Sequence, residues 1–401
     1  MKKCQQAAAL CLALALLALS ACAQIAYPPL KKGDKGPKVA ALRQRLYDLG
    51  YLKSFQKTDT VFDDATEKAV RAFESASSYE QTGIASGSLQ ALLYSHEAKV
   101  KAGTETERAY DLTPDIVPQK AVELPERDAE GYLAQGDPPF VHADRKDGRW
   151  IYLSDSLQVD ISRCVDQKSG IEWFEASIRT RGEEKPYTIL SRHGGHGFES
   201  PKALSKQHGS VLAISDDFFG YRVQKEKFQG VIIRNGKTLC QKTRVENRHN
   251  LQPLEVMAMF EDGTLRTFTS DGFTAKEWLA MGVTDTFAFG PILVQGGVIP
   301  RYFYSKEYRS YREPRCCLGM AADGSYRALL VTGRKAHSKG AYFKWLAEKM
   351  LDMGCVEAFN LDGGNTVAMV FMGDIINKPA GAQRKSVRDV SGLIAFGRGA
   401  E

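Results

Sequence analysis

The sequence lacks the cysteine patterns that define zinc sites and disulfide-stapled folds. Eight cysteines are scattered over 401 residues, and no two of them form a C-x-x-C pair. Beyond the N-terminal segment they are Cys164, Cys240, Cys316, Cys317 and Cys355. Adjacent cysteines such as Cys316 and Cys317 can hardly bond each other without strain. A zinc cluster is therefore not expected, and whether one or two disulfides form stays open.

Several well-defined catalytic motifs are also missing. The sequence contains neither a G-x-S-x-G nucleophile elbow nor an H-E-x-x-H helix, which argues against the esterases and zinc peptidases that use them. The stretch from Gly230 to Lys237 is one residue too long for a P-loop and lies on an expected strand. We interpret His193 to Gly197 as a glycine-rich loop. Nucleotide binding is not expected.

Charge of one sign is not concentrated in this chain. The formal net charge is only +6, and the basic residues alternate with acidic ones instead of forming blocks. Nucleic acid is therefore not expected as a partner. With 43% hydrophobic and 10% aromatic residues the chain can bury a large core, and its length exceeds one ordinary domain. We expect two domains.

No hydrophobic run is long enough to span a membrane, but one short run is typical of export. Residues 7–19, AAALCLALALLAL, follow Lys2 and Lys3, as in a secretory signal. We predict a signal peptide over residues 1–22, because Leu19-Ser20-Ala21-Cys22 resembles a lipobox and a lipid on Cys22 would tether the chain to a membrane. Cleavage after Ala21-Cys22-Ala23 is the alternative. Both predict an exported protein, either a membrane-anchored lipoprotein or a secreted, wall-associated one.

Residues 28–97 carry the periodicity of three short helices. The first presents an apolar face at spacings near 3.6 residues and ends at Gly50. A second helix is expected from about Asp63, and a third through Leu89 to Leu93. The expected inward residues of the first two helices are Val39, Leu42, Leu46, Leu49, Ala69, Val70 and Phe73.

This segment resembles the peptidoglycan-binding three-helix module over its whole length. The resemblance is carried by LKKGDKGPKVAALRQRLYDLGYL and FDDATEKAVRAFESASSYEQTGIASGSLQALLYS. It implies a cell-wall glycan or peptidoglycan as partner. Glu74 stands where the module usually has Gln, and a generic interaction bundle is the alternative.

The rest of the chain divides into a linker and a larger domain. Residues 98–148 are rich in charged residues and proline with little apolar periodicity, so we predict a linker there. Residues 149–401 alternate short β-branched and aromatic runs with Gly and Asp turns and have two clear helical patterns. The prediction is an α+β protein, with a small three-helix N-terminal bundle and a larger C-terminal domain around a mixed β-sheet.

Two of the polar clusters at strand ends in the larger domain contribute acids and glycines. Asp216 and Asp217 directly follow the apolar run 211–214; a capped turn is the alternative interpretation. The other cluster follows the strand 356–359, where a plain hairpin turn is the alternative. Consecutive glycines there also let the backbone approach a ligand and aim amides at an anion. The candidate residues of this cluster are Asn360, Asp362, Gly363, Gly364, Asn365 and Thr366.

The remaining polar cluster contributes Arg315 and Arg334, each at the edge of an apolar strand. A guanidinium group offers a planar fork of donors that fits phosphate oxygens with two parallel bonds, which lysine cannot reproduce. Surface salt bridges are the alternative interpretation.

Taken in order and spacing, the three clusters resemble the phosphodiester glycosidase family from about Leu153 to the end of the chain. Further matching segments are Gly230–Gly236, Phe289–Val294, Gly373–Asn377, and Arg384 with Asp389. Members hydrolyse a sugar, often N-acetylglucosamine, that is linked through its anomeric oxygen to a phosphodiester. The resemblance implies a hydrolase that releases free sugar and a phosphomonoester.

The resemblance also implies roles for these residues. Asp362 would assist attack at the anomeric centre and Asp217 would orient water or substrate, since an oxocarbenium-like transition state needs a nearby carboxylate. Arg315 and Arg334 would stabilise the departing phosphate. Asp216, Asn360, Asn365 and Thr366 would line the substrate site, and Gly363 and Gly364 would supply backbone donors. No cofactor is expected, although a divalent cation among the acids is not settled by the sequence.

Several positions depart from the family pattern. Ser215-Asp216-Asp217 replaces a common Asn-Gly-Asp, and Asn365-Thr366 replaces Gly-Ser. Thr332 stands where Asp is common, and Cys316 replaces a Thr. Altered specificity or lost activity would both fit these changes. Two alternatives therefore remain: a non-catalytic glycan-binding envelope protein, and a metal-dependent phosphodiesterase that cleaves the P–O bond.

Overall fold

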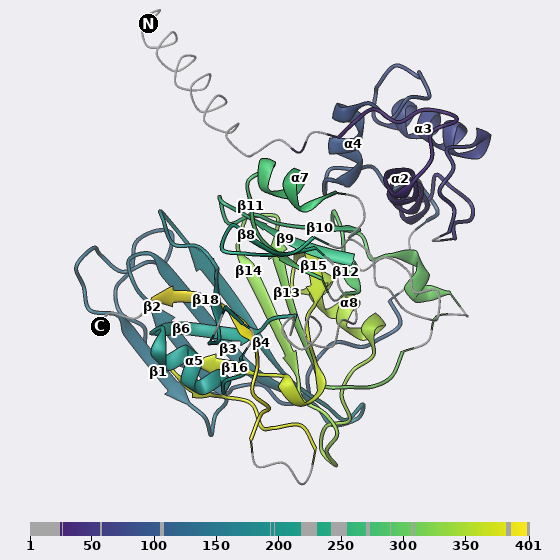
Figure 1. Ribbon diagram of the computed structural model, residues 1–401. Helices are drawn as coiled ribbons and strands as arrows, with labels where there is room; N and C mark the ends of the chain where they lie inside the picture. The colour runs from purple at the N-terminus through teal and green to yellow at the C-terminus, as the bar shows by residue number, and fades with distance from the viewer. Residues whose placement is uncertain are drawn as a thin grey trace, which may run out of the picture.

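The computed structural model confirms the α+β class (Figure 1). It describes residues 25, 27–56, 58–104, 108–192, 194–195, 197–217, 231–241, 255–269, 273–288, 290–305, 308, 310–381 and 386–398. Over these ranges no helix is both long and apolar enough to cross a membrane. The predicted signal peptide, including Cys22, lies outside them, as do His193, His196 and Arg384.

Three helices near the N-terminus pack into one small core. They are α2 (Pro37–Asp48), α3 (Asp64–Ala76) and α4 (Gly87–Tyr94). The carboxylate of Asp63 caps α3 by accepting the Thr66 N–H at 2.8 Å, and the hydroxyl of Ser86 caps α4 in the same way. Their core contains the apolar residues that were predicted to face inward, which are Val39, Leu42, Leu46, Leu49, Ala69, Val70, Phe73, Leu89 and Leu93. Leu92 is partly buried and packs against this core.

Glu74, which departs from the usual Gln, faces the inside of this bundle. Its side chain is 2% exposed and accepts bonds from the Thr82 hydroxyl at 2.6 Å and the Gly83 N–H at 2.9 Å. The carboxylate therefore holds the turn between α3 and α4, a structural use that does not require contact with a glycan.

The larger region is built on an eight-stranded sheet with the order β1-β2-β3-β4-β14-β13-β15-β12. The sequence predicted a mixed sheet, but the pairings among described strands are antiparallel throughout. The strands are β1 (Phe140–Asp144), β2 (Arg149–Leu153), β3 (Leu157–Asp166), β4 (Ile171–Thr180), β12 (Ile292–Val294), β13 (Arg315–Ala321), β14 (Tyr326–Val331) and β15 (Cys355–Asn360).

Three smaller sheets complete the β structure. A five-stranded sheet has the order β17-β16-β6-β18-β5, a three-stranded sheet the order β10-β9-β11, and β7 pairs with β8. The strands are β5 (Tyr187–Leu190), β6 (Ser210–Ser215), β7 (Ile232–Arg234), β8 (Lys237–Cys240), β9 (Glu255–Phe260), β10 (Leu265–Thr269), β11 (Val283–Phe287), β16 (Met369–Phe371), β17 (Asp374–Ile375) and β18 (Gly392–Arg398).

The main core lies between the large sheet and the five-stranded sheet. Phe174 and Tyr326 of the large sheet share this core with Ile214 and Phe396 of the smaller one, and the rings of Tyr326 and Phe396 are 5.2 Å apart. Helix α8 (Phe343–Asp352) covers the other face of the large sheet, where Trp345 packs on Trp173. Two layers of sheet and one helix thus hold the strand ends rigidly.

Residues 98–148, predicted as a linker, run along the larger region. Ile116 exchanges backbone bonds with Val165 of β3, and Ala109 N–H donates to the carboxylate of Glu348 in α8 at 3.0 Å. Strand β1 joins the sheet ahead of residue 149. Composition suggested a linker because the segment is rich in charged residues and proline with little apolar periodicity, yet its backbone contributes ladder bonds to β3 and β2.

Buried charged groups join the three-helix bundle to the larger region, and we call this contact the junction. Arg45 of α2 is 1% exposed and donates to the carbonyls of Leu93 and Gln295, each at 2.7 Å. The backbone N–H of Arg301 donates to Asp48 at 2.9 Å, and its guanidinium group donates to the Tyr47 carbonyl at 3.0 Å. The junction is therefore held by directed bonds from both sides.

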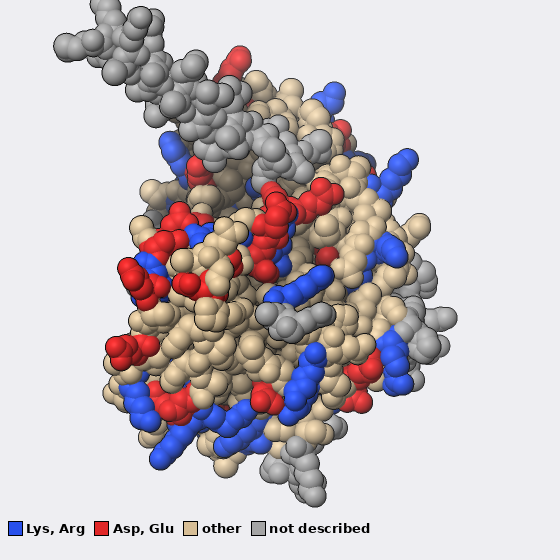
Figure 2. Space-filling model, turned by 90° about the vertical axis from the view of Figure 1, so that its left-hand side faces the viewer, with Lys and Arg blue, Asp and Glu red and all other residues tan. Residues whose placement is uncertain are grey.

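The surface carries both signs of charge. Basic and acidic side chains both occur over the face drawn in Figure 2, with several Lys and Arg along its lower edge. This distribution fits the expectation from the sequence that charges are interspersed.

Candidate functional site

The strand ends that carry the predicted site residues meet at one end of the large sheet. The loop after β15 is tied to β13 by the bond from Leu361 N–H to the Cys316 carbonyl at 2.8 Å. It is tied to β6 by the bond from Asp362 N–H to the Asp216 carbonyl at 2.9 Å. Segments about 150 residues apart in the chain are thus joined beside Asp362.

Asp362 is nearly buried and held by a hydroxyl group. Its exposed fraction is 9%, so one edge of the residue reaches the surface. The hydroxyl of Thr366 donates to Asp362 Oδ2 and also lies 2.7 Å from the Gly363 carbonyl oxygen. Thr366 itself is fully buried. The buried hydroxyl group of Thr366 therefore orients the carboxylate of Asp362 from inside the protein and does not face a ligand.

The two glycines after Asp362 allow the loop to approach its neighbours closely. A Cβ on Gly363 would lie 2.5 Å from the Pro314 carbonyl oxygen, so only glycine fits without movement. Gly364 has φ +66° and donates its N–H to that same carbonyl at 3.0 Å. The sequence suggested that both glycines supply backbone donors to the ligand, but the Gly364 N–H is already used within the protein.

Arg315 lies beside this loop on the edge of β13. The Cα of Arg315 is so close to the loop that a Cβ added to Gly363 would lie 3.7 Å from it. The guanidinium carbon of Arg315 lies 3.9 Å from the centre of the Phe343 ring. One terminal nitrogen donates to the Tyr311 carbonyl at 3.0 Å, whereas the buried Nε has no hydrogen-bond partner among the described residues. Burial lowers the pKa of Arg315, yet a guanidinium group stays protonated.

Arg334 approaches the loop from the end of β14. It has φ +58°, an uncommon conformation for a non-glycine residue, which turns its side chain toward the loop. Its Nη2 would lie 3.3 Å from a Cβ on Gly364, and its Nη1 donates to Asn365 at 3.3 Å. Glu313 accepts a bond from its Nε at 2.6 Å. With 42% of the side chain exposed, Arg334 and Asn365 form an accessible rim.

Asp217 occupies a different environment from the one expected. It is fully buried, accepts a bond from Ala288 N–H at 2.8 Å, and forms an ion pair with Arg234. Arg234 is 1% exposed and lies 4.5 Å from the centre of the Phe287 ring. Within the described ranges Asp217 is therefore buried beside Arg234 and Ala288, and its role in orienting water or substrate stays a prediction.

Asp216 and Asn360 are also buried. Asp216 is 1% exposed, contributes its carbonyl to the Asp362 N–H, and has Oδ2 4.0 Å from Arg234 Nη2. Asn360 is fully buried and donates to the Gly290 carbonyl at 2.8 Å. Asp216 thus supports the backbone that carries Asp362, whereas the Asn360 side chain holds the neighbouring segment at Gly290.

The remaining candidate chemistry involves thiols and metals. Burial raises the pKa of the Cys316 thiol, and the charges of Asp362 and Asp216 raise it further, so this thiol stays protonated. Cys164, Cys316, Cys317 and Cys355 form no disulfide within the described part of the chain. In the same part of the chain no group of three or more His, Cys, Asp or Glu side chains is arranged to hold a metal ion.

Sequence reasoning missed two residues that position this site. Arg234 was part of a matching segment but had no assigned role, although a charged residue directly after an apolar run is a signal that could have been used. Glu313, which precedes Pro314 and holds Arg334, gave no comparable signal, because its partner lies 21 residues away.

Two family models match this chain. Residues 208–396 match the model described as phosphodiester glycosidase, and residues 35–109 match the model of a putative peptidoglycan binding domain. Both resemblances predicted from the sequence are thereby confirmed, and together they support a glycosidase-like function. The first match contains all of the predicted site residues.

The relatives are distant. The SPbeta prophage-derived uncharacterized protein YomE of Bacillus subtilis (strain 168) is 23% identical in an alignment of 261 residues that covers 61% of this chain and 38% of that protein. The chain therefore spans well under half the length of this curated relative.

Two solved structures match part of this chain. The catalytic domain of zebrafish N-acetylglucosamine-1-phosphodiester alpha-N-acetylglucosaminidase, auto-inhibited by its pro-peptide, has a TM-score of 0.48 and 17% identity, covering 61% of this chain and 84% of that one. A hypothetical protein from Synechocystis has a TM-score of 0.41 and 12% identity, covering 65% of this chain and 64% of that one.

Proposed function

We propose that this chain is an exported cell-envelope hydrolase that cleaves a sugar 1-phosphodiester, with an N-acetylglucosamine-like sugar, to free sugar and a phosphomonoester. One observation carries the proposal. The loop that begins at Asp362 lies against Arg315 and Arg334 at one end of the sheet. A carboxylate and two guanidinium groups are the charges that this reaction needs at its two ends.

The carboxylate of Asp362 stabilises the positive charge on the sugar in this proposal. Positive charge develops at the anomeric carbon in the transition state, so an anionic group close to it lowers the barrier. Thr366 holds Asp362 in one orientation by a bond to Oδ2. Asp362 thus assists attack at the anomeric carbon.

The guanidinium groups of Arg315 and Arg334 stabilise the departing phosphate in this proposal. A phosphomonoester has a second pKa near 6, so it departs more easily than a sugar hydroxyl group and depends on positive charge more than on a strong acid. Arg315 has a buried N–H without a partner among the described residues, and Arg334 stands on the exposed rim. These two donors would share the phosphate oxygens.

Asp217 takes a positioning role in this scheme. Its ion pair with Arg234 stabilises the end of β6, and the neighbouring Asp216 carbonyl binds the backbone of Asp362. The pair therefore fixes the loop from behind the site without touching the substrate.

The proposed location at the cell envelope rests on features of the N-terminal part of the chain. A predicted signal peptide with Cys22, and a region that matches a putative peptidoglycan binding domain, support a membrane-anchored or secreted protein held at the wall. Wall teichoic acids, phosphoglycans and capsule linkages present sugar phosphodiesters in that location. We propose no cofactor.

Incubation with an N-acetylglucosamine 1-phosphodiester, followed by separation of the products, tests the proposal. We expect free sugar and a phosphomonoester, no effect of a chelator, and loss of turnover of at least about a thousandfold in Asp362→Asn with an unchanged melting temperature. Release of a sugar phosphate would support cleavage of the P–O bond instead. Binding of the substrate without turnover would support a non-catalytic glycan-binding protein.

A further inference from the structure

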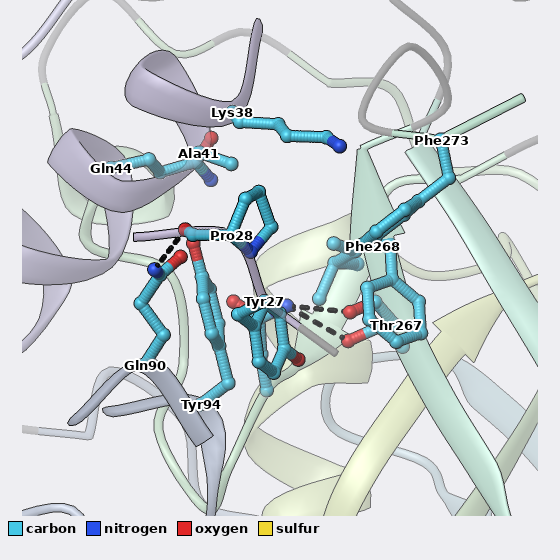
Figure 3. Close-up of a pocket in the computed structure, with 12 residues that line it drawn as sticks. Tyr27, Pro28, Lys38, Ala41, Gln44, Gln90, Tyr94, Thr267, Phe268 and Phe273 are labelled. Carbon is cyan, nitrogen blue, oxygen red and sulfur yellow. Dashed lines mark hydrogen bonds between the residues drawn. The ribbon is translucent and has the colours of Figure 1, made fainter. Parts of the chain in front are cut away.

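Cavities outside the candidate site differ greatly in size. One at the junction, between the bundle and β10, has a volume of about 40 Å³, and Figure 3 shows the rings of Tyr27, Tyr94 and Phe268 close around it. Such a space holds a few water molecules and no larger ligand. Another cavity, beside the start of α8, has a volume of about 370 Å³. This volume falls in the range of small-molecule sites, about 300–1,000 Å³.

The larger space, which we call the α8 cavity, is built from parts of the chain that are far apart in sequence. Its walls come from residues 109–115, from the turn 166–171 between β3 and β4, and from Arg312 with the start of α8. The guanidinium group of Arg312 donates to the carbonyl of Ser169 at 2.7 Å and to that of Gly340 at 2.9 Å. These bonds join the walls, and a preformed cavity loses less entropy on binding than one that must assemble.

Side chains of both charges line the α8 cavity. The acids are Asp111, Asp115 and Asp166, and the bases are Lys168 and Arg312. Within the described part of the chain, none of the five forms an ion pair. The bond from the Thr113 N–H lowers the pKa of the Asp111 carboxyl, which is therefore ionised at neutral pH. Charges of both signs around one space complement a ligand that itself carries both.

The acids gather around the turn between β3 and β4. Asp115 and Asp166 each accept a backbone N–H of this turn, at 2.7 Å and 2.9 Å, and both carboxylates keep further acceptor sites. Lys168 lies close enough to Asp111 to contribute to its lowered pKa. Three carboxylates against one ammonium group give this part of the lining a net negative charge.

The lining also offers unused hydrogen-bond donors. Arg312 binds three carbonyl groups through Nε and Nη2, whereas its Nη1 has no partner among the described residues. Trp345 lines the cavity with 2% of its surface exposed, and its indole N–H has no hydrogen-bond partner over the described ranges either. Buried donors are normally satisfied, so an unused one beside a cavity indicates an acceptor on a ligand. A carboxylate fits these two donors.

Ligands with one kind of charge, or none, match this lining less well. An anion such as inorganic phosphate would meet three carboxylates, and a simple cation would meet Arg312 and Lys168, so each would face like charges. A neutral ligand would take solvent from the charged groups without replacing it. An ammonium group and a carboxylate on one molecule pair with both parts of the lining.

We propose that the α8 cavity binds a zwitterion of dipeptide size. Its amino group lies among the carboxylates around the turn 166–169, and its carboxylate accepts bonds from Arg312 Nη1 and the Trp345 indole. Tyr110 and Tyr342, which also line the cavity, offer aromatic faces to its side chains. This inference goes beyond the proposed function, since it assigns a separate site whose occupation requires no turnover.

Calorimetry with the full chain and alanyl-alanine, in its L,L and D,D forms, tests the proposal. N-acetyl-alanyl-alanine lacks the amino charge and alanyl-alaninamide lacks the carboxylate, so each derivative removes one of the two expected contacts. We expect one form of the dipeptide to bind, and both derivatives of that form to bind at least about tenfold more weakly. Free alanine, which is too short to span both contacts, should also bind more weakly.

Two pairs of variants locate the ligand. Ala109→Trp fills the cavity, whereas Ala121→Trp places the same side chain at an exposed position outside the lining. Asp111→Asn removes a carboxylate from the lining, whereas Asp137→Asn removes one from an exposed residue outside it. We expect Ala109→Trp and Asp111→Asn to bind the dipeptide at least about tenfold more weakly, both controls to bind like wild type, and all four to keep the melting temperature of wild type.

Other results would overturn the proposal. No binding of either dipeptide at millimolar concentration would exclude this ligand, and equal binding of the N-acetyl derivative would exclude a site for an ammonium group. Equal affinity for free alanine would reject the dipeptide size, and equal binding by Ala109→Trp and wild type would place the dipeptide outside the cavity. Inorganic phosphate that binds to wild type but not to Ala109→Trp would identify an anion site instead.

Turnover of the 1-phosphodiester by the same samples separates the two proposals. Dipeptide binding without hydrolysis keeps the α8 cavity as a binding site and rejects the hydrolase. Hydrolysis without dipeptide binding does the reverse.

Discussion

At the scale of single residues, Asp362 depends on Thr366 for its orientation. The hydroxyl of Thr366 is buried, donates to Oδ2 and lies close to the Gly363 carbonyl. A threonine can therefore provide here the hydroxyl that a serine provides in the family pattern. The departure at this position is compatible with an active enzyme.

Thr366→Ala should lower kcat about 10- to 100-fold with little change in KM, because the carboxylate loses its orientation while the arginines stay in place. Thr366→Ser should restore most of the rate. Steady-state kinetics and pH profiles of the three proteins check this. A loss confined to KM, or equal losses in the Ala and Ser variants, would contradict a positioning role.

The contribution of Arg315 and Arg334 to the reaction rate should increase with the negative charge of the leaving group. Arg315→Ala is expected to reduce turnover of a sugar phosphodiester about 100-fold or more and to affect an aryl glycoside far less, because only the phosphate gains the bidentate charge-assisted bonds. Comparing kcat/KM for both substrates in wild type and variant measures the difference. Equal losses on both substrates would exclude the leaving-group role.

The residue types at the site could be predicted from the sequence, but their exposure could not. Asp362, Arg315 and Arg334 were recognised as an ordered set, and the structure brings their segments together. Asp217 looked equivalent to Asp362, since each is an acid after an apolar strand. Only the three-dimensional packing of Arg234 and Ala288 around Asp217 separates the two.

At the scale of elements, a buried ion pair joins two sheets behind the site. Asp217 follows β6 of the five-stranded sheet, and Arg234 ends β7 of the small hairpin. Both residues are fully buried or nearly so. Removing one partner takes a charge-assisted bond from the other at a buried position, which is more costly than removing both.

Arg234→Met should destabilise the protein by roughly 3–5 kcal/mol. The double variant Arg234→Met with Asp217→Asn should recover part of that loss. Chemical denaturation of the single variants and the double variant measures the coupling. Additive losses would show that the two residues do not act as a pair.

Strands with strong apolar runs were predicted well. The apolar runs 211–214 and 356–359 noted in the sequence lie within β6 and β15. Helix α5 (Pro201–Gln207) was missed because it has only 7 residues, although the Ser200 cap and Pro201 are a usable start signal. The alternation in β3 could also have been found, whereas the pairing order of strands is set by contacts that no local pattern contains.

At the scale of the whole molecule, the junction was not foreseen from the sequence. Arg45 is a charged residue at the edge of the apolar face of α2, and it is buried because the turn at Gln295 and Gly296 covers it. Burial raises the pKa of Asp48 to about 7 and that of Glu357 to about 7, in spite of the bonds that each accepts. These two carboxyl groups therefore keep their protons up to about pH 7 in the folded protein.

Stability should fall as the pH rises. An unfolded Asp48 would release its proton near its ordinary pKa of 3.8, whereas the folded protein keeps it up to about pH 7. The stabilisation is complete below the lower value, is lost progressively across this window, and amounts to at most about 4 kcal/mol. Asp48→Asn should reduce the slope of unfolding free energy between about pH 4 and about pH 7, leaving the part due to Glu357. Identical slopes in wild type and variant would contradict this.

The central claim is that this chain breaks the bond between the anomeric carbon and oxygen, with Asp362 at the sugar and the arginines at the phosphate. Hydrolysis of an N-acetylglucosamine 1-phosphodiester in water enriched in oxygen-18, followed by mass spectrometry of both products, tests it most directly. The label is predicted on the anomeric hydroxyl of the free sugar, with none in the phosphomonoester and no labelled product from Asp362→Asn. Label in a phosphate group would show attack at phosphorus and contradict the account.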